Sequence, residues 1–219
     1  ASACEFEVAE QTESRVTFVL RDNEVTRAQF PFAFLFKVRY ALKESTVEVT
    51  YTVDNPEDEM LHFGLGGHPG FNVPLKEGTS FEDYYLRFSQ PCEPDRVGFS
   101  SEILVSGVDK RYELEGGQII RLRHDLFDHD AIVLKNMAKS VTIASDKTKR
   151  YVTVSYPQMP YVGFWHAERK DAPYVCIEPW VSLPARDGVV EDFACKGDLI
   201  HLPGHGSYEN TWYITIGEE

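Results

Sequence analysis

The stretch FLFKVRYALKESTVEVTYTV, residues 34–53, decides the fold class of this chain. Apolar and polar side chains alternate on either side of Lys43-Glu44-Ser45, which is the pattern of two half-buried strands joined by a tight hairpin. The same period of two returns over Val16–Leu20, over residues 141–156 around a turn at Asp146–Lys149, and over Trp212–Ile216. Valine, threonine, tyrosine and phenylalanine are residues that strands favour. The sequence therefore predicts an all-β protein.

Helical segments are few and no linker divides the chain. We expect one short turn of helix at Asn23–Gln29 and another at Asp125–Asp130, because prolines recur throughout and limit longer helices. Neither an internal repeat nor a segment rich in Gly, Pro and Ser is present. We predict a single antiparallel domain over residues 1–219 with sheets packed face to face. The order of elements leaves a large sandwich, a jelly roll and a barrel open.

Composition excludes several classes of function. The chain has 219 residues, of which 42% are hydrophobic and 26% are charged, enough for a packed core. Its net charge of −13 disfavours a nucleic-acid partner. It contains neither an apolar stretch long enough to span a bilayer nor a secretory signal. We therefore expect a cytoplasmic protein that binds neither nucleic acid nor membranes.

The cysteines and histidines give little sign of a metal site. No two of the four cysteines have C-x-x-C spacing, and Cys176, in an apolar run, is expected to be a buried free thiol. Disulfides remain open on sequence alone. The histidines and carboxylates of residues 124–131 match no zinc or calcium loop. We predict no metal and no other cofactor.

A glycine-rich stretch, Gly64–Asn72, follows an apolar run and carries His68. Glycine weakens a strand unless a backbone or a ligand must approach closely. Pro69 favours an extended conformation at His68. This places an imidazole, a side chain suited to proton transfer near neutral pH, at the end of a strand. The alternative is a turn histidine that only hydrogen-bonds the backbone.

The segment Tyr174–Trp180 ends an apolar strand with a carboxylate. If Val175 and Ile177 face one layer, Cys176 and Glu178 face the other. A carboxylate in this position must be paired, solvated in a cleft, or functional. A structural ion pair is the competing interpretation. Trp180 offers a flat apolar surface of the kind against which sugar rings pack.

The segment Tyr161–His166 contains Phe164, Trp165 and His166. Core packing is the ordinary role of such aromatic residues. The sharper hypothesis makes Trp165 a wall of a sugar-binding cleft. His62, His201 and His205 have no partner pattern, and we assign them no role.

Two strings in the sequence are characteristic of one family. GGHPGFNVPL, residues 66–75, resembles the GGHPxFNxPL signature of the aldose 1-epimerase (galactose mutarotase) superfamily, in its LacX-like branch. VCIEPW, residues 175–180, resembles a strand of that branch. Residues 127–134, 199–204 and 208–216 are similar to its central and closing segments. The resemblance extends in order from about Cys4 to the C-terminus.

The resemblance implies a galactose mutarotase-like β-supersandwich whose concave sheet holds a hexose. It assigns the general acid at the ring oxygen to His68 and the general base at the anomeric hydroxyl to Glu178. The sugar-binding aspartate falls on Asp130, with Asp128 as a competing alignment. Family members carry a further N-terminal stretch, with an arginine and a histidine, before the position matching Cys4. We therefore expect an N-terminally incomplete domain.

The resemblance further implies an isomerase that interconverts the α and β anomers of a small-molecule aldose without a cofactor. Two alternatives stay open. One is a non-catalytic carbohydrate-binding protein on the same fold, since fold does not dictate function. The other is a hexose-phosphate mutarotase, which would need clustered Arg or Lys at the cleft rim.

Overall fold

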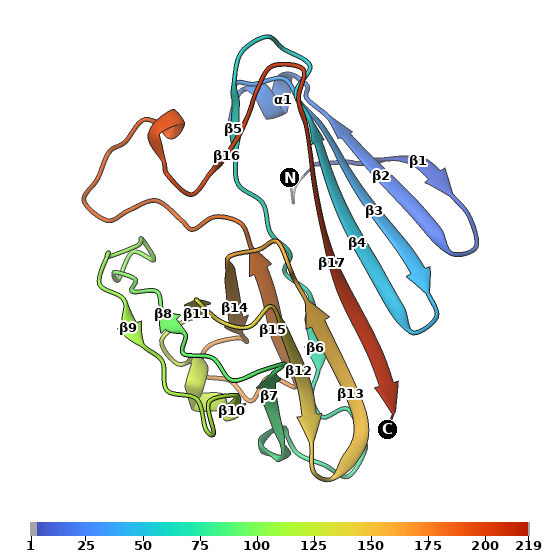
Figure 1. Cartoon of the computed structure of the whole chain (residues 1–219), viewed down its shortest axis with the longest axis vertical. Helices are drawn as coiled ribbons and strands as arrows, with labels where there is room; N and C mark the ends of the chain where they lie inside the picture. The colour runs from blue at the N-terminus through green and yellow to red at the C-terminus, as the bar shows by residue number, and fades with distance from the viewer. Residues whose placement is uncertain (1–3, 219) are drawn as a thin grey trace. The chain divides into compact units, whose positions relative to one another are not determined.

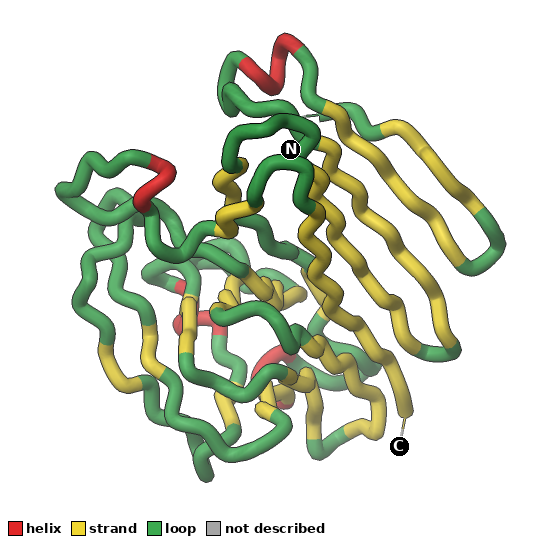
Figure 2. The backbone as a smooth tube through the Cα atoms, turned by 45° about the horizontal axis from the view of Figure 1, so that its top comes forward, coloured by secondary structure: helices red, strands yellow, loops and turns green. Residues whose placement is uncertain are grey.

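The computed structural model describes residues 4–218 and is nearly all β, as predicted. Figure 2 shows that helix is confined to a few short pieces. The short helices are α1 (Glu24–Arg27) and three 3-10 turns, η1 (Phe81–Asp83), η2 (His124–Phe127) and η3 (Phe193–Cys195). Asn23 caps α1 by accepting from the backbone N–H groups of Val25 and Thr26. Both predicted helical turns are therefore present. None of the described helices has the length and apolar character that a membrane crossing requires.

The described residues divide into two compact units, residues 4–63 with 199–215, and residues 64–198 with 216–218. In the first unit, neighbouring antiparallel strands follow the order β1-β2-β3-β4-β17 (Figure 1). A separate pair joins β5 and β16. The strands are β1 (Glu7–Gln11), β2 (Arg15–Arg21), β3 (Leu35–Lys43), β4 (Thr46–Asp54), β5 (Leu61–Phe63), β16 (Ile200–Leu202) and β17 (Ser207–Glu218). The last residues of β17, from Ile216 onward, are counted with the second unit.

The first unit is built around the hairpin predicted from residues 34–53. β3 and β4 pair from Leu35 opposite Asp54 to Lys43 opposite Thr46. Glu44 takes the tight turn with φ 54°. On β4 the side chains of Val49, Tyr51 and Val53 are buried, as the alternation predicts, but Thr50 of the opposite face is buried as well. One feature escaped the sequence: His62 and His201 face each other across β5 and β16, with their Nδ1 atoms 2.6 Å apart.

The second unit is a sandwich of two antiparallel sheets, with strand orders β13-β12-β7-β10 and β6-β15-β14-β11-β8-β9. Its strands are β6 (Gly70–Asn72), β7 (Tyr84–Phe88), β8 (Asp95–Arg96), β9 (Lys110–Arg111), β10 (Ile119–Arg121), β11 (Ile132–Lys135), β12 (Ser140–Ser145), β13 (Thr148–Ser155), β14 (Tyr161–Trp165) and β15 (Tyr174–Trp180). Phe88 of β7 meets Phe164 of β14 with ring centroids 6.1 Å apart. Apolar side chains from both sheets thus form one core.

The second sheet of this unit buries one face and leaves the other for chemistry. On β15 the side chains of Val175 and Ile177 are fully buried, and on β14 those of Val162 and Phe164 are fully buried. The residues between them point the opposite way, because successive strand side chains alternate between faces. Gly163 lies directly opposite Glu178 in the β14–β15 pairing. The opposite face of this sheet forms the floor of the candidate site.

Candidate active site

His68 and Glu178 come from two segments that run side by side within the second unit. Glu178 lies on β15, and His68 lies on the irregular segment between β5 and β6. The N–H of Gly67 donates to the carbonyl of Pro179 at 2.9 Å, and the N–H of Ile177 donates to the carbonyl of Pro69 at 3.2 Å. These two backbone bonds flank His68 and hold it against β15.

Gly66 explains why the stretch before His68 is rich in glycine. A Cβ atom at this position would lie 2.5 Å from Cδ1 of Trp180 and 2.9 Å from the carbonyl oxygen of Pro179. Any other residue would force the segment away from β15. The close backbone approach expected from the glycines is therefore present, and its partner is the strand that carries Glu178.

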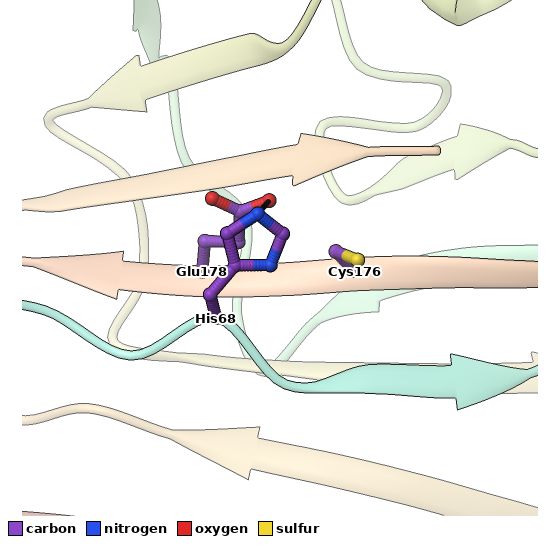
Figure 3. Close-up of side chains that lie close together, drawn as sticks. All are labelled: His68, Cys176 and Glu178. Carbon is purple, nitrogen blue, oxygen red and sulfur yellow. Dashed lines mark ion pairs between the residues drawn. The ribbon is translucent and has the colours of Figure 1, made fainter. Parts of the chain in front are cut away.

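The acid and base candidates are in contact. Nε2 of His68 lies 3.3 Å from Oε1 of Glu178, and Figure 3 shows the imidazole ring beside the carboxyl group. Their side chains are 62% and 4% exposed, respectively. The contact lacks hydrogen-bond geometry, so Oε1 has no hydrogen-bond partner among residues 4–218. A buried carboxylate oxygen without a hydrogen-bond partner is costly and is therefore suited to accept a hydrogen bond from a ligand.

The environment of Glu178 changes its protonation. Burial, followed by the negative charge of Asp130, raises the pKa of Glu178 to about 7. At neutral pH the carboxyl group thus exchanges readily between its charged and neutral forms. This is the property that a general base needs when it must also return its proton.

His68 and Glu178 open onto a cleft of about 1140 Å³ in the second unit. Trp165 and Trp180 supply aromatic walls, and the Trp165 ring meets the His68 ring edge to face with centroids 5.8 Å apart. Asp128 and Asp130 also line the cleft. All five predicted site residues, His68, Glu178, Asp130, Asp128 and Trp165, thus share one cavity large enough for a sugar.

Several other histidines, arginines and cysteines lie outside the acid–base pair. His166 is fully buried and contacts His124, with Nδ1 of His124 3.1 Å from Nε2 of His166. Arg123 and Arg186 form surface ion pairs with Asp125 and Glu191. The structure contains four free thiols, Cys4, Cys92, Cys176 and Cys195, so the described cysteines form no disulfide.

Sequence reasoning placed Cys176 on the same strand face as Glu178 but gave its thiol no role, and the thiol lies beside the acid–base pair. Two basic residues of the cleft were missed. Arg96 and Lys110 line the cleft from β8 and β9. These strands have two residues each, too short for any alternation to be read.

The fold and the site define a class of mutarotase-like β-sandwich proteins with a sugar-sized cleft. This chain belongs to the aldose 1-epimerase family, whose sequence profile matches residues 1–185. It is 32% identical over 183 residues to the chromosomal LacX protein of Lactococcus lactis subsp. lactis, a match that covers 82% of this chain and 60% of the relative. The chain thus spans less than two thirds of the length of that relative.

Solved structures agree with this assignment. A galactose mutarotase related enzyme from Lactobacillus acidophilus superposes with a TM-score of 0.90 at 33% identity, covering 98% of this chain and 72% of the other. A galactose mutarotase-like protein from Lactobacillus casei superposes with a TM-score of 0.87 at 30% identity, covering 97% of this chain and 73% of the other. The predicted superfamily, its LacX-like branch and its fold are confirmed.

Proposed function

We propose that this chain is a mutarotase that interconverts the α and β anomers of a hexose, with Glu178 as general base and His68 as general acid. One observation carries the proposal: a buried carboxylate oxygen without a hydrogen-bond partner lies 3.3 Å from an exposed imidazole at a sugar-sized cleft. Membership of the aldose 1-epimerase family supports it.

The reaction needs one acid and one base on neighbouring oxygens of the sugar. The anomeric hydroxyl O1 and the ring oxygen O5 are bonded to the same carbon, so two groups in contact can serve both. Glu178 removes the proton from O1 while the imidazolium of His68 donates its Nε2 proton to O5. The C1–O5 bond breaks as C1=O1 forms, and the ring opens to the free aldehyde.

Rotation about C1–C2 then presents either face of the aldehyde to O5. Ring closure reverses both proton transfers: His68 takes the proton from O5 and Glu178 returns one to O1. In this proposal Asp128 and Asp130 accept hydrogen bonds from sugar hydroxyls, and Trp165 packs against the ring. Both catalytic groups end each turnover in their starting protonation states.

Polarimetry tests the proposal directly. Wild-type protein is expected to accelerate the mutarotation of α-D-glucose or α-D-galactose, and Glu178→Gln is expected to lower kcat about 10²–10⁴-fold. Glu93→Gln is the matched control, because Glu93 is 86% exposed and does not line the cleft. Equilibration of several aldoses and their 6-phosphates at the buffer rate would favour a non-catalytic sugar-binding protein, and calorimetric titration with the same sugars would then detect binding.

A phosphorylated hexose is the second candidate substrate, and three cations support it. Arg96, Lys110 and Arg169 line the cleft, and none forms an ion pair with a carboxylate among the described residues. Guanidinium and ammonium groups are the usual partners of phosphate. If the substrate is phosphorylated, Lys110→Glu lowers kcat/KM for the hexose 6-phosphate and leaves that for the neutral hexose unchanged.

A further inference from the structure

The thiol of Cys176 lies next to the acid–base pair and has no part in the proposed ring opening. A ring nitrogen of His68, the Sγ atom of Cys176 and a carboxylate oxygen of Glu178 all lie within 4.8 Å of one another. Cys176 and Glu178 extend from the same side of β15, and His68 reaches them from the neighbouring segment (Figure 3). Within the described residues no other group of three potential metal ligands comes together in this way.

The three donors are those that zinc prefers. Zn²⁺ binds thiolate, imidazole and carboxylate, and sites that keep an exchangeable position use three protein ligands and one water. Ligand atoms at about 2.0–2.3 Å from a tetrahedral zinc lie roughly 3.5 Å apart. The 3.3 Å between Nε2 of His68 and Oε1 of Glu178 already matches this spacing, and no side of the triangle exceeds 4.8 Å. The side chain of His68 is 62% exposed, and the cleft provides the open fourth position.

We propose that His68, Cys176 and Glu178 form a Zn²⁺ site that overlaps the sugar site. The unpartnered Oε1 atom of Glu178 supplies one ligand without breaking an existing hydrogen bond. Binding requires the Cys176 thiol to release its proton to the buffer. Mg²⁺ and Ca²⁺ are excluded because they require oxygen ligands.

The charge of the ion offsets an unfavourable environment. Burial, followed by the charge of Glu178, raises the pKa of the Cys176 thiol to about 12. A bound dication reverses this effect, because it neutralises both the thiolate and the carboxylate. With Zn²⁺ in place neither His68 nor Glu178 can exchange a proton with a sugar, so the ion inhibits mutarotation. Only this inhibition rests on the proposed function; metal binding does not.

Cobalt substitution tests the site in the full chain. Wild-type protein titrated with Co²⁺ is expected to bind one ion with intense visible d–d bands and a near-ultraviolet thiolate charge-transfer band, and Zn²⁺ displaces it. Cys176→Ser loses the charge-transfer band and binds at least about 10-fold more weakly. His62→Ala keeps both properties, because the His62–His201 pair lies in the other unit.

A second variant guards against misfolding of Cys176→Ser. Replacing Cys4, Cys92 and Cys195 with serine leaves Cys176 as the single thiol, and the charge-transfer band persists. Loss of the band in this variant, its survival in folded Cys176→Ser, or its absence in the wild type would overturn the site.

Activity measurements separate this proposal from the proposed function. Zn²⁺ is expected to inhibit wild-type mutarotation over the range in which it binds, EDTA restores the rate, and Mg²⁺ has no effect. Zinc binding that leaves mutarotation unchanged contradicts the overlap of the two sites. Absence of mutarotation in EDTA contradicts the proposed function alone, and the cobalt spectra still decide the metal site.

Discussion

Glu178 combines three properties at the scale of one residue: burial, an oxygen without a hydrogen-bond partner, and a raised pKa. His68, its partner, is largely exposed. Local sequence physics left a structural and a functional role open for each residue, and spacing could not pair them because 110 positions separate them. The family resemblance predicted that they share one cleft, and the structure places them in contact. Their contact arises from hydrogen bonds between β15 and residues 67–69, which no sequence period encodes.

The raised pKa of Glu178 makes protein stability depend on pH. The value in the folded protein, about 7, exceeds the free value of 4.5, so the native state holds the proton more tightly. The contribution of the protonated Glu178 carboxyl group to stability is therefore fully present below pH 4.5 and falls as the pH rises towards 7. At about 1.4 kcal/mol per pKa unit, the loss is of order 3 kcal/mol.

Glu178→Gln is expected to remove this dependence. The variant should be more stable than wild type at pH 8 and lose that advantage near pH 4.5, as measured by urea unfolding in buffers that contain EDTA. Wild-type and variant free energies of unfolding that run parallel from pH 4.5 to 8 would contradict the buried, partly protonated carboxyl group.

At the scale of elements, long strands were predictable and short ones were not. The β3–β4 hairpin and the β12–β13 hairpin follow from alternation and turn residues. By contrast, β6, β8 and β9 have two or three residues and are specified by pairing with their neighbours. Because β8 and β9 bring Arg96 and Lys110 to the cleft, these two basic lining residues could not be predicted from the sequence pattern.

Gly66 lets the segment that carries His68 pack closely against β15, and its substitution tests that close packing. Gly66→Ala places a methyl group against Trp180 and the Pro179 carbonyl, and neither can yield without moving β15 or the segment. We expect a loss of about 1–3 kcal/mol in stability, typical of overpacking, with a fall in kcat as His68 moves.

Gly197→Ala is the matched control for this substitution, because nothing lies within 4 Å of the added Cβ atom. Thermal unfolding and polarimetry measure both effects. Equal behaviour of the two alanine variants would contradict the close packing of residue 66 on β15.

At the scale of the whole molecule, the described residues of the cleft all belong to the second of two compact units. Core substitutions in either unit are therefore expected to lower stability, but only those in the second unit are expected to change the kinetic constants. Leu20 is buried on β2 of the first unit, and Leu134 is buried on β11 of the second, next to the cleft residue Val133.

Leu20→Ala and Leu134→Ala each are expected to lower the free energy of unfolding by about 2–5 kcal/mol. Only Leu134→Ala is expected to change KM or kcat, measured well below the unfolding midpoint, because the cavity it creates lies in the sheet that forms the cleft floor. An altered KM in Leu20→Ala would contradict this separation.

The unequal exposure of the two candidate catalytic side chains has a consequence for chemical probes. An electrophile that enters the cleft reaches the 62%-exposed imidazole of His68 first, whereas the 4%-exposed carboxyl group of Glu178 is shielded from bulky reagents. A hexose bearing a small acylating group at its anomeric end would therefore label the histidine and leave the glutamate intact. Covalent inhibitors of this cleft should therefore be designed to react with the imidazole of His68, whereas Glu178 should be addressed by reversible ligands that hydrogen-bond its carboxylate.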